Sequence, residues 1–374
     1  MNQVGAIARA AGCAIAIAWL GASCDGREQA REASRELHPL GSEGRGRAAD
    51  VEARITEPTR APDVVAPTPV VGSGVGAPAA ADGARRLLGE GPDEDSVLRA
   101  LALATPRRFG SVGTTAVVLK MDLGATIDGA FKPRTHLHPQ GWLAEIAAFR
   151  VARCLGLDDV PAAVTRTMRR EQLRERLDPE DAAKLPLIES RILWDGDSVR
   201  GAAIQWIRGL TPLGLERDER VAQWSGWLSQ AGAPAPAEQV ELARDISNTL
   251  VFDYVIGNFD RWSGSNLGGT PDGRRLYIRD HNLAFVSPLP HEQGERLWRR
   301  LGRAQRFSLS LVRALRELDA ARLREELERD PSLHDRPRLV GNWVRDVLGR
   351  RDAVLSHVAT LIDEHGAARV LVFR

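Results

Sequence analysis

Cysteine is scarce in this chain, and the few that occur form no ligand pattern. Cys13, Cys24 and Cys154 show no spacing typical of a metal site. Three cysteines in 374 residues also exclude a fold held together by a framework of disulfides. Cys154 stands alone in an apolar helical stretch, so we interpret it as a residue that fills the core.

Net charge is also nearly absent. Lysine and arginine together number 51 and aspartate and glutamate 50, which leaves a formal net charge of +1. This balance provides no general basic field, so the composition argues against a nucleic-acid binder. The length is sufficient for two compact lobes with additional segments at the ends.

The apolar run near the N-terminus is too short to span a membrane, but residues 1–24 have the pattern of a secretory signal. Arg9 precedes the run Ala14–Leu20, and small residues lead to Cys24. The segment Leu20-Gly-Ala-Ser-Cys24 resembles a bacterial lipoprotein cleavage site, which implies a lipid anchor on Cys24. The alternatives are a plain signal peptide or an Ala-rich start. We expect an exported cell-envelope protein, or a cytoplasmic one if the segment is not a signal.

Residues 25–91 lack aromatic side chains and any hydrophobic period. They are rich in Ala, Pro, Gly, Arg and Glu, and Ala66–Ala84 follows neither a helical nor a strand repeat. Such a segment cannot bury a core. We interpret it as a disordered linker and place the folded domain at residues 92–374, beginning with a helix at Asp93–Leu103.

Short β-rich runs at Ala116–Leu119 and Gly129–Phe131 open the folded domain. The turn before them contains Gly113, whose backbone could approach a phosphate, although most such turns are only turns. Lys132 directly follows the second run, at the end of a strand and before Pro133. A lysine at a strand end is usually solvated, but it can also serve as a point charge for nucleotide phosphates.

The segment Gly141–Leu157 has the apolar spacing of an amphipathic helix. Glu145 lies in its first turns among apolar neighbours. One interpretation is a surface glutamate favoured by the helix dipole. The other is an inward glutamate that pairs with Lys132 or binds a metal. A strand at Ala163–Met168 follows.

A hairpin is predicted next. Its arms are Ser190–Trp194 and Val199–Ile207, joined by a turn that contains Asp195-Gly196.

The stretch 251–285 carries the densest set of reactive side chains. A helix at Glu238–Ile256 ends in a polar loop with Asp260 and Asn266, and a turn and a short strand then lead to Asp280. Phosphoryl transfer requires one acid that orients the attacking hydroxyl, and an acid with an amide that hold a metal on the phosphates. Taken alone, an ordinary surface loop is an equally good interpretation.

The pattern beyond this stretch is helical. We expect helices at Glu292–Leu301, at Ser308–Glu328 and at Leu339–Glu364, the last with a break near Gly349.

Four motifs occur in order along roughly residues 113–285: Gly129-Ala-Phe-Lys132-Pro133, Ala144-Glu145-Ile-Ala-Ala-Phe149 with the following Leu-Gly and Val-Pro pairs, Gly257-Asn-Phe-Asp260-Arg261, and Asp280-His-Asn-Leu-Ala-Phe285. Together they resemble the secretory-pathway kinase family that includes the Golgi casein kinase and four-jointed. The last motif also resembles a loop of the type II phosphatidylinositol kinases.

The resemblance implies a role for each matching residue. Lys132 would bind the phosphates of ATP, and Glu145 would contact that lysine and a metal. Asp260 would be the catalytic acid that orients the acceptor hydroxyl. Asp280 would bind Mg²⁺ or Mn²⁺. Gln205 to Gly209 would occupy the place of the hinge between the lobes, where backbone groups would hold an adenine base. Asn266 lies near the place of a second metal ligand, but one residue later than in many kinases.

Two features depart from the family. The eukaryotic relatives carry several disulfides that this chain lacks, and Asp280 is followed by His281-Asn282 rather than Asn-Gly. The loop after the metal ligand is therefore expected to differ.

These observations predict an α+β, two-lobed, atypical protein-kinase-like fold. A mostly antiparallel sheet with one helix would form the N-lobe (92–207), and helices the C-lobe (208–374). We expect ATP-dependent transfer to a hydroxyl, with protein Ser/Thr as the first candidate acceptor. The alternatives are a nucleotide-binding pseudokinase or envelope scaffold without transfer activity, and a sugar or small-molecule kinase.

Overall fold

The computed structural model describes residues 93–113, 116–124, 127–263 and 266–374. The expected signal segment, the lipid anchor at Cys24 and the linker at 25–91 lie outside the described residues. Within the part that is described, no helix is both long and apolar enough to cross a membrane.

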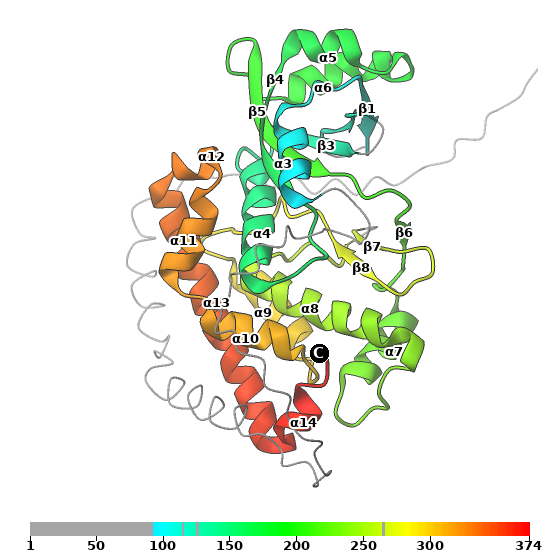
Figure 1. The fold of residues 1–374 in the computed structure, drawn as a ribbon, viewed down its shortest axis with the longest axis vertical. Helices are drawn as coiled ribbons and strands as arrows, with labels where there is room; N and C mark the ends of the chain where they lie inside the picture. Colours follow the sequence, from blue (N-terminus) through cyan, green and yellow to red (C-terminus); the bar gives the residue numbers. More distant parts are fainter. Residues whose placement is uncertain (1–92, 114–115, 125–126, 264–265) are drawn as a thin grey trace, which may run out of the picture. The chain divides into compact units, whose positions relative to one another are not determined.

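A five-stranded sheet forms the first lobe (Figure 1). All of its neighbouring strands are antiparallel, in the order β1-β2-β3-β5-β4. The strands are β1 Arg108–Val112, β2 Val118–Asp122, β3 Asp128–Pro133, β4 Ala163–Arg169 and β5 Ser198–Gln205. The antiparallel sheet predicted for the N-lobe is confirmed.

Two helices cover opposite faces of this sheet. Helix α3 (Glu94–Leu103) is capped by Asp93 and contacts the face that carries Arg166, whose guanidinium donates to the carbonyls of Leu101 and Ala104. Helix α4 (Gly141–Leu155) lies on the other face and is buried along almost its whole length. It ends where Gly156 adopts the left-handed conformation that favours glycine.

The prediction of a strand at Ser190–Trp194, the first arm of the hairpin, was wrong. Ser190 and Arg191 end helix α6 (Leu185–Arg191), which follows helix α5 (Arg170–Arg176) and the 3₁₀ helix η1 (Pro179–Lys184). Strand β5 has β3 on one side and β4 on the other, so neither edge is open to another strand. A short apolar run such as Ile192–Trp194 does not distinguish helix from strand by its pattern.

The second lobe is helical with one small sheet. Its strands are β6 Thr211–Pro212, β7 Leu267–Gly269 and β8 Leu276–Ile278. Its helices are α7 Asp218–Leu228, η2 Ala237–Gln239, α8 Val240–Ile256, α9 His291–Leu301, α10 Leu309–Glu317, α11 Ala320–Glu328, α12 Pro331–His334, α13 Pro337–His365 and α14 Ala367–Val370. The prediction of a helical C-lobe is confirmed.

Two predicted helix boundaries in this lobe were wrong. The single helix expected at 308–328 is interrupted, because Asp319 caps α11 by accepting from the backbone N–H of Arg322. The break expected near Gly349 does not occur. Glycine costs a helix only about 1 kcal/mol, and the buried Val347 and Val354 on either side outweigh that cost.

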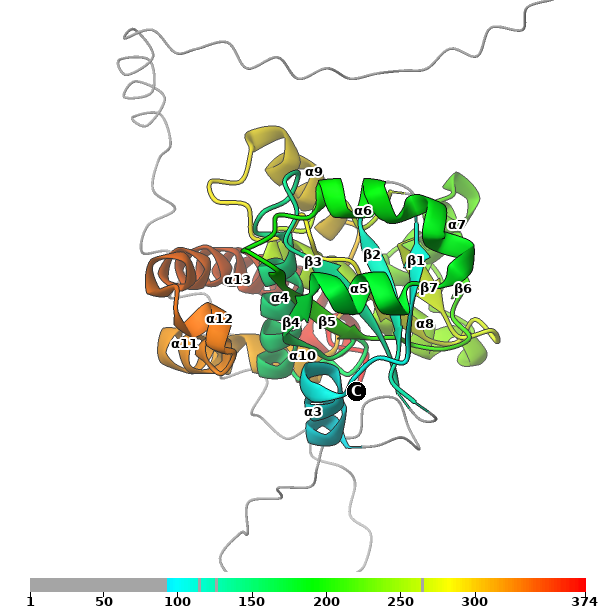
Figure 2. The ribbon, with the colours of Figure 1, turned by 90° about the horizontal axis from the view of Figure 1, so that it is seen from above.

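Helix α4 is also held from the side of the helical lobe. Figure 2 shows it between the sheet and the helices α11 to α13. Arg150 on α4 donates to Glu326 on α11 at 3.2 Å, and both side chains are mostly buried. The predicted core residue Cys154 is buried on the same helix, and burial raises the pKa of its thiol to about 11. The helix that carries Glu145 is therefore fixed by both lobes.

Candidate active site

Three charged residues from distant parts of the chain meet between the lobes. The Nζ atom of Lys132, near the end of β3, lies 2.6 Å from Oε1 of Glu145 on α4. The same atom lies 2.8 Å from Oδ1 of Asp280, which follows β8. Glu145 therefore points inward and pairs with Lys132, as one of its two interpretations predicted, and it is not a surface residue.

Burial and charge act against each other in this cluster. The side chain of Glu145 is 2 % exposed and that of Lys132 16 % exposed. Burial alone would lower the pKa of Lys132, but the charges of Glu145 and Asp280 outweigh it and raise the pKa. Burial raises the pKa of Glu145, against the opposing effect of Lys132. Burial would also raise the pKa of Asp280, but the charge of Lys132 outweighs it and lowers the pKa to about 2.

The two carboxylates fit a hard divalent cation. The recorded contacts of each use a single oxygen, Oε1 of Glu145 and Oδ1 of Asp280, so each has a second oxygen for a metal. The Asp280 side chain is 38 % exposed, which leaves it open to a ligand. Among the described residues, no group of three or more His, Cys, Asp or Glu side chains could hold a metal by itself. Few protein ligands are typical of Mg²⁺ sites, which phosphates and water complete.

Asp260 lies on the loop that follows helix α8. Gly257 ends this helix in the left-handed conformation, and Asp260 comes three residues later. The hydroxyl of Ser263 donates to Oδ1 of Asp260 at 2.6 Å and to its backbone carbonyl at 2.7 Å. Oδ1 of Asn258 accepts from the backbone N–H of Asp260 at 3.3 Å. These contacts orient the loop and leave the Asp260 carboxylate half-buried.

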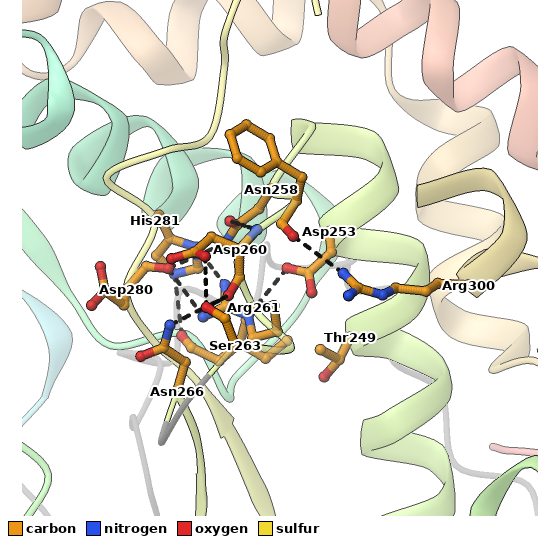
Figure 3. Close-up of polar contacts among 12 residues, drawn as sticks. Thr249, Asp253, Asn258, Asp260, Arg261, Ser263, Asn266, Asp280, His281 and Arg300 are labelled. Atoms are coloured by element: carbon orange, nitrogen blue, oxygen red, sulfur yellow. Dashed lines mark hydrogen bonds and ion pairs between the residues drawn. The ribbon is translucent and has the colours of Figure 1, made fainter. Parts of the chain in front are cut away.

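Asn266 lies beside Asp260 in Figure 3. Its Nδ2 atom is 3.5 Å from the Asp260 carbonyl oxygen, a long hydrogen bond. This contact of the Asn266 side chain is thus to the loop that carries Asp260. The role of Asn266 as a metal ligand stays a prediction.

Gly113 follows strand β1, in the turn toward β2. It has a φ of +81°, and no atom lies within 4 Å of the position that a Cβ would take. The next two residues lie outside the described ranges. At Gly113 itself the main chain is therefore open, and the phosphate contact stays a prediction.

Gln205 is the last residue of β5, and its side chain lies on the face opposite Lys132. In the strand register it pairs with Gly129, whereas Lys132 pairs with Ala202, and alternate residues face opposite sides. A nucleotide on the Lys132 face would therefore meet main chain here, and not the Gln205 side chain. The main-chain N–H of Gln205 already donates to the carbonyl of Ala162.

Several residues near the site had no role in the sequence prediction. Arg261 is fully buried, its Nε donates to Oδ1 of Asp253 at 3.2 Å, and it also contacts His281 (Figure 3). Burial raises the pKa of Asp253 to about 6, against the opposing effect of Arg261. The available signal was Asp253 itself, because a carboxylate within the apolar run of α8 requires a buried partner.

No family model matches this chain. In sequence it is 25 % identical over 246 residues to a glycosaminoglycan xylosylkinase of Danio rerio, a match that covers 53 % of this chain and 58 % of that protein. The glycosaminoglycan xylosylkinase of Homo sapiens is 24 % identical over 175 residues, which is 39 % of this chain and 42 % of that protein. The chain therefore spans about half the length of the curated relatives it matches.

In structure, the chain is similar to the Golgi casein kinase with Mn and ADP bound. The TM-score is 0.55 at 19 % identity, over 75 % of this chain and 78 % of that one. The structure of hydra Fam20 with sugar gives a TM-score of 0.54 at 19 % identity, over 73 % of this chain and 90 % of that one. The predicted two-lobed α+β fold and the predicted resemblance to secretory-pathway kinases are confirmed.

Proposed function

We propose that this chain is a kinase that transfers the γ-phosphate of ATP to a hydroxyl acceptor with a divalent metal. The observation that carries the proposal is the placement of Lys132 between Glu145 and Asp280, with Asp260 on the neighbouring loop. Phosphoryl transfer depends mainly on positioning and on charge stabilisation, and these residues supply both. The kinase names of the sequence relatives and the Mn/ADP complex of a structural relative support it.

Each residue has a task that follows from its place. Lys132 would neutralise phosphate oxygens with the point charge of its ammonium. Two carboxylates hold that ammonium in place, on the sheet face toward the helical lobe. Asp280, with Glu145, would hold Mg²⁺ or Mn²⁺, which neutralises charge on the phosphates. Asp260 would accept a hydrogen bond from the acceptor hydroxyl and orient it. Gly113 and the main chain around Gln205 would contact the nucleotide.

A protein Ser/Thr hydroxyl is the first candidate acceptor, and the name of one structural relative, a casein kinase, supports a protein substrate. A sugar hydroxyl is the second. Both sequence relatives are named glycosaminoglycan xylosylkinases, and these names favour a sugar hydroxyl as the acceptor. Acceptor choice depends on loops that the four motifs do not include.

The test of transfer uses the full chain with ATP and Mn²⁺, and measures ADP release with a panel of protein and glycan acceptors. We expect acceptor-stimulated ADP formation that is lost in Asp260→Asn. Nucleotide binding without ADP formation, for every acceptor and for the protein itself, would favour the pseudokinase or envelope scaffold. Absence of nucleotide binding would overturn both.

Export is proposed together with this activity, through the signal at residues 1–24 and the linker at 25–91. Cys24 would carry the lipid. Metabolic labelling with a radioactive fatty acid tests this directly, because Cys24→Ser should abolish incorporation while Cys154→Ser retains it. Equal labelling of the two variants would contradict the anchor.

A further inference from the structure

The peptide bond between Asp280 and His281 is held at both ends. Its carbonyl oxygen accepts from Nδ2 of Asn258 and from Nη1 of Arg261, each at 3.1 Å. Its N–H, on His281, donates to Oε1 of Glu145 at 3.0 Å. The peptide thus connects the catalytic loop to helix α4, and rotating it would break all three hydrogen bonds.

The backbone of Asp280 needs such support. Its φ is +67°, in the left-handed region, although it is not a glycine. This conformation costs a residue with a Cβ about 1–2 kcal/mol. Because the side chain leaves the same Cα, the conformation also determines whether the carboxylate reaches Lys132. The donors to the carbonyl therefore act on the direction of the carboxylate.

Arg261 is held in place by further contacts of its own. It is fully buried, and three of its nitrogens contact three different groups: Asp253, the Asp280 carbonyl and Nδ1 of His281 at 2.9 Å (Figure 3). Arginine only donates, so Nδ1 of His281 accepts. Nε2 of His281 then carries the proton and donates to the carbonyl of Ile278 at 3.2 Å.

We propose that Arg261 is a positioning residue that holds the Asp280–His281 peptide, and thereby aims the Asp280 carboxylate at Lys132 and the metal. His281 serves as the buried acceptor that orients Arg261. An asparagine at this position also has an acceptor oxygen, so His281 can be exchanged for it without losing the contact. The inference rests on the proposed function, because it concerns the same metal site.

The test measures Mn²⁺ binding by the full-length protein in the presence of ADP, by the loss of the free Mn²⁺ signal in electron paramagnetic resonance. ADP affinity without metal is measured in parallel. Substitution of a residue that orients a metal ligand typically lowers metal affinity by about 10- to 100-fold. We expect a loss in that range for Arg261→Lys and for His281→Leu, with metal-free ADP affinity unchanged. The matched variant His281→Asn should stay close to wild type.

The outcomes separate the claims. Equal Mn²⁺ affinity in wild type and a folded His281→Leu would overturn this inference, and so would an equal loss in His281→Asn and His281→Leu. If Arg261→Lys does not fold, the two His281 variants decide the matter alone. A wild-type protein that binds ADP but never Mn²⁺ would overturn the proposed metal site and this inference with it.

Discussion

Thr165 on strand β4 donates two hydrogen bonds to the carboxylate of Asp330, one from its main-chain N–H and one from its hydroxyl. The N–H lies 2.9 Å from Oδ2 and the hydroxyl 2.6 Å from Oδ1. Asp330 is fully buried and also caps helix α12 by accepting from the backbone N–H of Ser332. One carboxylate thus joins the outer strand of the sheet to the helical lobe, beside the helix that carries Glu145.

This contact predicts a graded loss of stability. Thr165→Val removes only the hydroxyl bond, so we expect a cost of about 1–2 kcal/mol in the free energy of unfolding. Asp330→Ala removes the cap and leaves the donors of Thr165 without an acceptor, so the cost should be about 3 kcal/mol. Urea unfolding measures both. Equal effects of the two substitutions would contradict the shared role of Asp330.

Removing the Lys132 charge should affect both nucleotide binding and folding. Lys132→Met leaves Glu145 and Asp280 next to each other without a cation, and breaking such a buried pair costs about 3 kcal/mol. Thermal shift should also show that ADP with Mn²⁺ no longer stabilises the variant. Lys184→Met is the matched control, because Lys184 is exposed in η1. If ADP stabilises Lys132→Met as much as wild type, the phosphate role is wrong.

Asp260 should be needed for transfer and not for folding. Its carboxylate is half-buried and its recorded side-chain contact is to the exposed Ser263, so Asp260→Asn should change unfolding by less than about 1 kcal/mol. A positioned acid or base contributes about 10²- to 10⁴-fold, so turnover should fall by that factor with the nucleotide KM unchanged. Steady-state kinetics with Asp272→Asn, in the exposed turn after β7, provide the control. A tenfold or larger rise in KM with normal kcat would contradict this role.

Asp159 should make stability depend on pH. Burial raises its pKa well above the usual value, and the charges of Asp245 and Asp158 add to the effect. The folded protein therefore keeps a proton that the unfolded chain releases above about pH 4. The contribution of Asp159 to the free energy of unfolding is fully present below that pH. It is lost as the pH rises toward the pKa of Asp159 in the folded protein, by at most about 1.4 kcal/mol per pH unit.

The variant Asp159→Asn removes this dependence. It should be more stable than wild type at pH 7.5, and the difference should shrink toward pH 4. Urea unfolding at several pH values gives the comparison, with the exposed Asp197→Asn as control. A difference that stays constant across this range would show that Asp159 does not hold the proton.

Much of the site could be predicted from local sequence. The strand before Lys132, the amphipathic helix around Glu145 and the loop after helix α8 each follow from residue spacing within one element. The order of these elements also carried the resemblance that predicted the kinase-like fold. The prediction of a strand for the first hairpin arm was wrong, because the sequence does not show that β5 already has neighbours on both edges.

What the sequence alone determined is therefore on which elements the candidate site residues lie, since helical and strand periods are local properties. Tertiary structure alone decided that Glu145 turns inward to meet Lys132, that the Gln205 side chain faces away, and that Arg261 reaches both Asp253 and the Asp280 carbonyl. These outcomes depend on packing between elements far apart in the chain. A buried charge finds its partner in space, and spacing along the sequence does not specify that partner.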